Sequence, residues 1–464
     1  MQSMKTLLSL SFFMLLFLGG LLLFYSFEPD SGEENLSSLK KTKEAELESG
    51  RKLELPEIKD KTELVKDEPS ALFNDPAINQ AWGLKRSDAA RAWSVSQGSR
   101  DITVAIIDTG IDIHHEDLEA NLWNNPGETG LVDSPFCKKQ TAPLTLKECD
   151  KSRNGKDDDT NDMIDDVHGW NFVSNNSDLT DNHGHGTHIA GIIGAMGGNN
   201  KGIIGISPNV SLMILKYYDP KVSSTDNLKN TIQAIRYAID KGAQIINYSG
   251  GGTDYSQEEF EGVRLAEKKG ILFVAAAGNE RSNSDQFHYY PADYKLKNLI
   301  SVTAVDPGTE VLSSSNYGVE TVHIAAPGQN ILSTLPGNTY GYMTGTSQAT
   351  AFVSGAAALI MAHRRSFDAE DVRKYILSTG DATTQLRTKT KSARILNLYK
   401  TLTILDQGVT ASGGKPANTA NFTKEFLSED QKKTPNESML EFGKGLKDVL
   451  QRAPKANDKD PKKP

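Results

Sequence analysis

Between about residues 79 and 399, short apolar runs alternate with longer stretches in which apolar positions recur at helical spacing. The short runs predict strands and the longer stretches predict helices. The predicted strands cover residues 102–107, 211–215, 244–248, 271–277, 299–305 and 322–326. The predicted helices cover residues 185–196, 227–241, 257–269, 346–364 and 369–377. Strands that are apolar on both sides and separated by helices indicate an α/β fold, a three-layer sandwich whose mostly parallel central sheet has helices on both faces.

One N-terminal hydrophobic helix is expected ahead of this block. Residues 6–27 carry no charged side chain, and at ~1.5 Å per residue they are long enough to cross the ~30 Å hydrocarbon core of a membrane. Lys5 precedes the run and acidic residues follow it, which places the N-terminus in the cytoplasm and the rest of the chain outside. The run lacks a clear small-residue cleavage site, which favours a signal anchor over a cleaved signal peptide. The sequence therefore predicts an extracytoplasmic protein, membrane-anchored through residues 6–27 if these stay uncleaved and secreted otherwise.

The remaining segments differ from the central block in composition. Residues 28–74 are rich in Glu, Lys, Ser and Thr, as expected of a disordered charged tether or a short pro-segment. Residues 75–405 form the predicted domain, with an insertion at about 124–180. Residues 406–464 are a low-complexity polar tail in which only 437–452 has the apolar spacing of a helix.

Composition narrows the possible functions only slightly. The 464 residues carry a formal net charge of -9, and this acidic balance argues against a general nucleic-acid binder. Two cysteines are too few for a disulfide-scaffold fold or a four-cysteine zinc site.

Four reactive side chains stand at the ends of predicted strands or at the starts of predicted helices. Asp108 and Asn279 follow strands, while His185 and Ser347 begin helices. Each has an ordinary structural explanation when taken alone, as a turn residue, a core histidine or a helix cap. Ligands of parallel sheets bind beyond the carboxyl ends of the strands, so we expect the four side chains to converge there. Together they provide the acid, base, oxyanion donor and nucleophile that acyl transfer by a serine requires.

The sequence around these residues resembles the subtilisin-like serine peptidases, the subtilases. Residues 106–111 (Ile-Ile-Asp-Thr-Gly-Ile) resemble the acid motif of that family, and residues 181–188 resemble its base motif, with His185 in the catalytic position. Residues 276–279 match the oxyanion motif and residues 345–347 the nucleophile motif. The resemblance implies a subtilisin-like fold and a serine endopeptidase, acting on extended or unfolded proteins without a cofactor for the chemistry. It also implies polypeptide substrates. We expect no nucleic-acid partner, given the acidic balance, and a monomer.

The resemblance further implies a set of substrate-binding residues. One group would pair with the extended substrate backbone, and the other would line the pocket for the side chain before the scissile bond. The first group is Ser249, Gly250 and Gly251, and the second is Ala276, Ala277, Gly278 and Tyr289. Gly250 stands where a larger apolar residue is common, so we expect a more open distal pocket beside it.

Both cysteines lie in the insertion between the acid and the base. In an exported chain Cys137 and Cys149 are expected to pair, and a disulfide that closes a loop of this size contributes about 3 kcal/mol. The alternative is two free thiols, because the redox compartment is itself an inference.

An acidic cluster in the same insertion predicts a structural calcium site. Asp157, Asp159 and Asn161 alternate along the loop, with Asp166 shortly after, which is how a loop wraps Ca²⁺. Position 162 lacks the glycine of an EF-hand, and similar loops occur in calcium-dependent subtilases. The alternative is a solvated acidic loop without a bound ion.

Two other readings remain open for the chemistry around Asp108. The Asp-Thr-Gly at residues 108–110 also fits an aspartic peptidase, which needs a second such carboxylate; the similar Asp-Ser-Gly triplet, at residues 30–32, lies in the charged tether. A non-catalytic binding module on the same fold is a further alternative.

A zinc hydrolase is the third alternative. His183, His185 and His188 form an H-x-H-x-x-H pattern, although Thr187 stands where the usual two-metal version has an aspartate.

Overall fold

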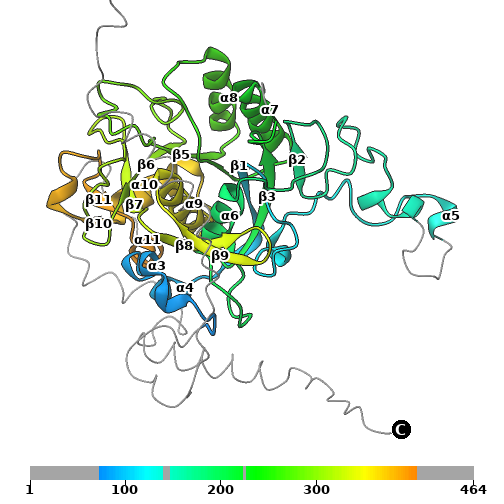
Figure 1. The fold of residues 1–464 in the computed structure, drawn as a ribbon, viewed down its shortest axis with the longest axis horizontal. Helices are drawn as coiled ribbons and strands as arrows, with labels where there is room; N and C mark the ends of the chain where they lie inside the picture. The colour runs from blue at the N-terminus through cyan, green and yellow to red at the C-terminus, as the bar shows by residue number, and fades with distance from the viewer. Residues whose placement is uncertain (1–72, 139–146, 223–225, 405–464) are drawn as a thin grey trace, which may run out of the picture. The chain divides into compact units, whose positions relative to one another are not determined.

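The computed structural model describes residues 73–138, 147–222 and 226–404 (Figure 1). The hydrophobic helix predicted at 6–27, nearly all of the segment 28–74 and the tail 406–464 with its possible helix at 437–452 lie outside the described residues. Within the described ranges, no helix combines the length and the apolar character needed to cross a membrane.

A mostly parallel nine-stranded sheet is the centre of the fold, as the sequence predicts (Figure 1). Its strand order is β10-β11-β7-β6-β5-β4-β1-β3-β2, and only the β10–β11 pair is antiparallel. The strands are β1 (Gly98–Asp108), β2 (Gly169–Asn171), β3 (Asn209–Lys216), β4 (Ile245–Tyr248), β5 (Leu272–Ala276), β6 (Leu299–Val305), β7 (Ile324–Pro327), β10 (Asp381–Ala382) and β11 (Arg394–Ile395). A separate antiparallel hairpin is formed by β8 (Ile331–Leu335) and β9 (Thr339–Met343).

Helices cover both faces of this sheet. The α-helices are α3 (Trp82–Arg86), α4 (Ala89–Trp93), α5 (Pro135–Lys138), α6 (His185–Gly194), α7 (Asn227–Asp240), α8 (Gln257–Lys268), α9 (Thr346–His363), α10 (Ala369–Thr379) and α11 (Leu398–Thr403). The 3₁₀ helices are η2 (Ile78–Gln80), η3 (Glu119–Asn121), η4 (Lys147–Cys149), η5 (Lys151–Arg153) and η6 (Thr384–Leu386).

The two faces of the sheet belong to two apolar cores. Along β1, Val104 and Ile106 join the core that also contains buried residues of α6, α9, α10 and α11. Ala105 and Ile107 point the other way and join the core formed with α7 and α8, which lie side by side (Figure 1). This alternation follows from the two-residue period of a strand, and it explains why residues 104–107 of β1 are apolar without a break.

Helix starts distinguish the structural helices from the two that begin with candidate site residues. In α7, α8 and α10 the N-cap side chains of Asp226, Ser256 and Asp368 accept a backbone N–H of the first turn. By contrast, α6 and α9 begin after Gly184 and Gly345, which have no side chain to cap them. First-turn N–H groups of α6 and α9 are instead bonded to side chains outside the helix: Thr109 and Asp181 for α6, and Asn279 for α9.

Candidate active site

The candidate residues lie near the carboxyl end of β1, where the order of the strands in the sheet reverses direction. Strand β1 pairs with β3 on one side and with β4 on the other, so the carboxyl end of β1 lies at a topological switch point. Asp108 is the last residue of β1, and Ser249 directly follows β4. This edge of the sheet is where ligands of open α/β folds bind.

Asp108 and His185 are brought into direct contact. The Nδ1 atom of His185 lies 2.7 Å from Oδ1 of Asp108, although 77 positions separate them in the chain. The carboxylate is 3% exposed, and its Oδ1 also accepts the Thr109 N–H at 2.8 Å. Burial lowers the pKa of His185, but the charge and hydrogen bond of Asp108 outweigh it and leave the pKa above its ordinary value. Because Nδ1–H donates to the carboxylate, Nε2 is the ring atom left to accept a proton.

Ser347 is in the first turn of α9, next to the end of β4. Its hydroxyl donates to the Ser249 carbonyl at 3.2 Å, and the Ser249 hydroxyl reaches the Ser347 carbonyl at 3.5 Å. Within the described part of the chain, no hydrogen bond joins the Ser347 hydroxyl to the His185 ring. Rotation about one side-chain bond redirects this hydroxyl, and such catalytic hydrogen bonds are often long before substrate binds.

Asn279 contacts the start of the same helix. Its Oδ1 accepts both the backbone N–H of Thr346 at 3.1 Å and the Thr346 hydroxyl at 3.2 Å. With Oδ1 occupied by donors, the amide orientation is fixed and Nδ2–H₂ is the group left to donate. Asn279 is exposed, just beyond the end of β5.

One residue from each predicted substrate-binding group, Gly251 and Gly278, lies against Tyr289. A Cβ on Gly251 would lie 2.5 Å from the Tyr289 ring, and a Cβ on Gly278 would lie 3.1 Å from it. Gly252 and Tyr290 also exchange two backbone hydrogen bonds, of 2.9 and 2.7 Å. Burial raises the pKa of the Tyr289 hydroxyl, which therefore stays neutral. The glycines are needed here because a side chain would overlap the tyrosine ring or backbone.

The prediction of a more open distal pocket beside Gly250 is wrong. A Cβ at this position would lie 2.5 Å from the Tyr217 hydroxyl and 3.0 Å from the Tyr248 ring. Tyr217 follows β3, and its backbone N–H donates to the Asp108 carbonyl at 3.0 Å. A tyrosine from a neighbouring strand end thus takes the space that a larger residue at 250 would fill.

The histidine pattern does not form a zinc site. His188 is fully buried in α6, and its Nε2 lies 2.9 Å from the Ile331 carbonyl and 3.2 Å from the Gly341 carbonyl. Nε2 of His188 therefore carries the ring proton, and among the described residues the histidines of this pattern belong to no group of side chains placed to hold a metal ion. Burial and the neighbouring His185 lower the pKa of His188 to about 3, so the ring is neutral.

The arrangement around Asp108 also differs from that of an aspartic peptidase. Asp108 pairs with the imidazole of His185, whereas an aspartic peptidase needs a second carboxylate.

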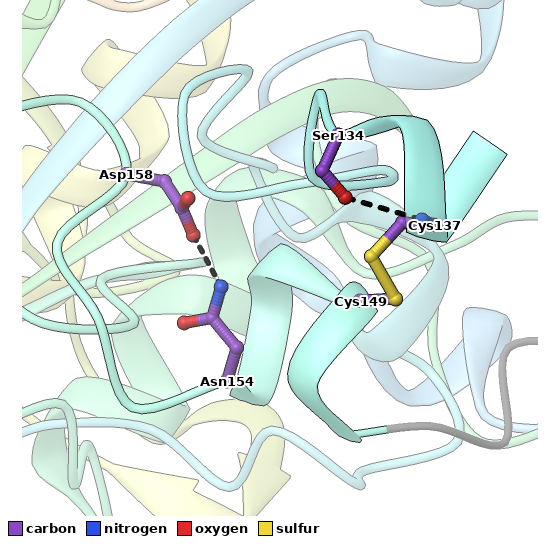
Figure 2. Close-up of a disulfide and its surroundings, with 5 residues drawn as sticks. All are labelled: Ser134, Cys137, Cys149, Asn154 and Asp158. Carbon is purple, nitrogen blue, oxygen red and sulfur yellow. Dashed lines mark hydrogen bonds between the residues drawn. A yellow bond between two sulfur atoms is a disulfide. The ribbon is translucent and has the colours of Figure 1, made fainter.

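A disulfide joins Cys137 in α5 to Cys149 in η4, with the two Cα atoms 5.4 Å apart (Figure 2). The Cys137 N–H donates to the Ser134 hydroxyl at 3.1 Å, and in the same region Asn154 donates to Asp158 at 2.7 Å. Helix α5 lies at the far end of the insertion, away from α6 and α9 (Figure 1). The crosslink therefore acts on the insertion rather than on the catalytic edge.

Three carboxylates of the insertion come together in a way that fits a divalent cation. Candidate ligand atoms of Glu128, Asp159 and Asp166 lie within 4.8 Å of one another. One oxygen of Glu128 and one of Asp159 are buried and have no hydrogen-bond partner among the described residues. Burial, together with Asp166 and Asp159, raises the pKa of Glu128 to about 7. The ammonium of Lys241 pairs with Asp159 and lies 3.5 Å from Asp166, so a single cationic side chain faces the three carboxyl groups.

The four predicted calcium ligands divide into different roles in this arrangement. Asp159 and Asp166 belong to the three-carboxylate cluster, and Asn161 donates to Asp166 at 2.8 Å. Asp157 instead accepts four backbone N–H groups, from residues 159 to 162, and shapes the loop. Glu128 was missed because it precedes the acidic run by about thirty positions, and no spacing in the sequence links the two.

Comparison with known proteins gives the same family as the motifs. Residues 99–424 match the family model described as the subtilase family. Over 328 residues the chain is 33% identical to thermitase of Thermoactinomyces vulgaris, which covers 70% of this chain and 98% of that protein. It is also 33% identical to a thermophilic serine proteinase of Bacillus sp. (strain AK1), over 72% of each chain. The similarity to subtilisin-like protease 1 of Plasmodium berghei is 31% identity over 48% of that protein. The chain therefore belongs to the subtilase family of subtilisin-like serine peptidases.

Proposed function

We propose that this chain is an endopeptidase of extended or unfolded proteins in which Ser347 is the nucleophile, His185 the base and Asp108 the acid that orients it. The observation that carries the proposal is the 2.7 Å contact between Asp108 and His185 at the strand edge where Ser347 also lies. A buried carboxylate that holds one ring nitrogen leaves the other free to take a proton from a serine hydroxyl.

The proposed reaction has two steps. The Ser347 hydroxyl attacks the scissile carbonyl while its proton moves to Nε2 of His185, and the imidazolium is stabilised by Asp108. The proton then passes to the leaving amine, the C–N bond breaks, and water hydrolyses the acyl-enzyme by the reverse proton route.

Two donors would stabilise the oxyanion of each tetrahedral intermediate. They are the Asn279 amide and the backbone N–H of Ser347, which has no intrahelical acceptor in the first turn of α9. A side-chain donor of this kind is worth about 2.7–4 kcal/mol, a magnitude measured for the equivalent asparagine of a subtilisin.

Substrate would bind as an added β-strand along residues 249–251. Residues 276–278 and Tyr289 would then enclose the side chain that precedes the scissile bond. This requires an extended polypeptide, which is why we assign unfolded or extended segments as substrates.

The carboxylates of Glu128, Asp159 and Asp166 would hold a structural calcium ion, with no part in the chemistry. The two unpartnered buried oxygens support this assignment. We further propose that the enzyme is a monomer working outside the cytoplasm, anchored through residues 6–27 or secreted. The apolar run and the disulfide support that location.

Replacement of the nucleophile tests the proposal. Ser347→Ala is expected to abolish both casein hydrolysis and covalent labelling by a peptide phosphonate, whereas Ser313→Ala, at an exposed serine, should leave both unchanged. Unchanged casein hydrolysis by folded Ser347→Ala would overturn the assignment. Inhibition of the wild type by a statine-type compound alone would favour the aspartic alternative, and no hydrolysis by the wild type would favour a binding module.

A further inference from the structure

The loop that carries Asn279 is wrapped around one amide side chain from a later part of the chain. Asn316 lies between β6 and β7. Its Oδ1 accepts the backbone N–H groups of Glu280 at 3.0 Å and Ser282 at 2.9 Å. Its Nδ2 donates to the Ala277 carbonyl at 2.9 Å and to the Glu280 carboxylate at 2.6 Å. The backbone N–H of Asn316 also donates to the Gly278 carbonyl, at 2.9 Å.

Asn316 is itself firmly anchored. The residue is 1% exposed, and its carbonyl accepts the hydroxyls of Thr303 in β6 at 2.8 Å and Ser315 at 3.2 Å. The hydrogen bonds of Oδ1 and Nδ2 satisfy both functions of its amide, so the side chain has one orientation in this site. The loop is therefore tied to the sheet through this one residue.

The side chain of Asn279 is held from one side, by the start of α9. It is exposed, and its side-chain bonds go to Thr346 at the start of α9. Gly278, directly before it, has φ +99°, and a Cβ there would lie 2.5 Å from Nδ2 of Asn316. The Glu280 carboxylate, 2.3 Å from the same Cβ position, crowds it as well, so only glycine fits this left-handed position immediately before Asn279.

We infer that Asn316 is a positioning residue for the oxyanion donor: it holds residues 277–282 so that the Asn279 amide is aimed before substrate arrives. The inference rests on the proposed role of Asn279. A donor stabilises developing charge only where it is already in place, and a displacement of about 1 Å costs on the order of a hundredfold in rate.

An amide is the group that this position requires. A carboxylate would face the Glu280 carboxylate and the Ala277 carbonyl across the bonds that Nδ2 now makes. An alanine would leave the Ala277 carbonyl and two backbone N–H groups without their present partners. Both replacements should loosen the loop without touching the Ser347–His185–Asp108 residues.

A double-mutant cycle tests the inference. We would measure kcat at saturating peptide p-nitroanilide for the wild type, N279A, N316A and N279A/N316A. N279A is expected to lose about 10²–10³-fold in kcat. N316A should lose about ten- to a hundredfold in the wild type, but less than about threefold when Asn279 is already absent. Equal losses in both backgrounds would overturn the inference alone, because Asn316 would then not act through Asn279. Wild-type kcat in N279A would instead refute the proposed role of Asn279, and this inference with it.

A matched variant separates positioning from folding. Asn121 is also 1% exposed, and its Nδ2 donates to two backbone carbonyls, those of Gly194 and Pro208. N121A should lower the melting temperature much as N316A does, while kcat stays at the wild-type value. A comparable loss of kcat in N121A would show that buried amides act through stability alone and would overturn the inference. If N316A does not fold, the isosteric N316D takes its place in the same cycle, with the same expected non-additivity.

Discussion

Replacing Asp108 by asparagine removes one negative charge from the catalytic edge and leaves the shape of the side chain unchanged. The carboxylate oxygen lies 2.7 Å from Nδ1 of His185, so the centres of the two charges are about 4 Å apart when the ring is protonated. At an effective dielectric constant of about 20, that pair is worth about 4 kcal/mol, or roughly a thousandfold in rate. We therefore expect Asp108→Asn to lower the plateau of kcat/KM about a thousandfold.

The pH profile provides a second, independent readout of the same change. Asp108 helps to hold the pKa of His185 above its ordinary value, and only the neutral ring can accept the serine proton. Activity of the wild type should therefore rise with pH through this raised pKa. Without the charge the pKa falls, and the acidic limb of the profile moves to lower pH.

The assay is kcat/KM on a peptide p-nitroanilide between about pH 5 and 10. Asp285→Asn is a suitable control, because Asp285 accepts backbone N–H groups of residues 319–321 and has no contact with His185. An unshifted acidic limb in Asp108→Asn would refute the electrostatic reasoning, and an unchanged plateau would refute the role of Asp108 altogether.

Three further predictions concern calcium, pH stability and the distal pocket. Chelation should lower the melting temperature of the wild type but have little effect on Glu128→Gln; an equal EDTA effect in both would contradict the cation site. Burial raises the pKa of Glu259, 4% exposed, to about 7, so this carboxyl alone should lower wild-type stability by about 2.5 kcal/mol as pH rises from 5 to 8. Glu259→Gln should remove that part of the pH dependence, and identical stability profiles by calorimetry would count against it. Tyr217→Ala should open the space beside Gly250 and raise kcat/KM for peptides with a bulky distal residue relative to alanine. An unchanged ratio would mean that this space is not a substrate pocket.

The part of the fold that sequence predicts best is the part with strong periodicity. Strands β1 and β3–β7 and helices α6–α10 are present, with ends shifted by a few residues from the predicted ones. Strands β2, β10 and β11 are only two or three residues long, too short for any period to be visible. The β8–β9 hairpin was missed because its strands contain serine, threonine and glycine between the apolar positions.

The candidate site likewise contains residues that local motifs predicted and residues that they did not. The approach of His185 to Asp108 follows from the rule that strand ends of a parallel sheet converge, so motifs at those ends were informative. Glu128, Tyr217 and Asn316 were missed because each acts on residues far from it in the chain. Such contacts depend on how loops pack over the sheet, and no local pattern encodes them.

The order of the catalytic parts along the chain has a consequence for biosynthesis. Asp108 and His185 come from β1 and α6, whereas Asn316 and the start of α9 are made more than a hundred residues later. A ribosome or export channel releases the N-terminal portion first, and domains fold as units once their residues are present. Under the proposed mechanism, a half-made molecule therefore holds the acid and the base but not the nucleophile, so it does not digest itself or its neighbours until its last third has emerged and folded.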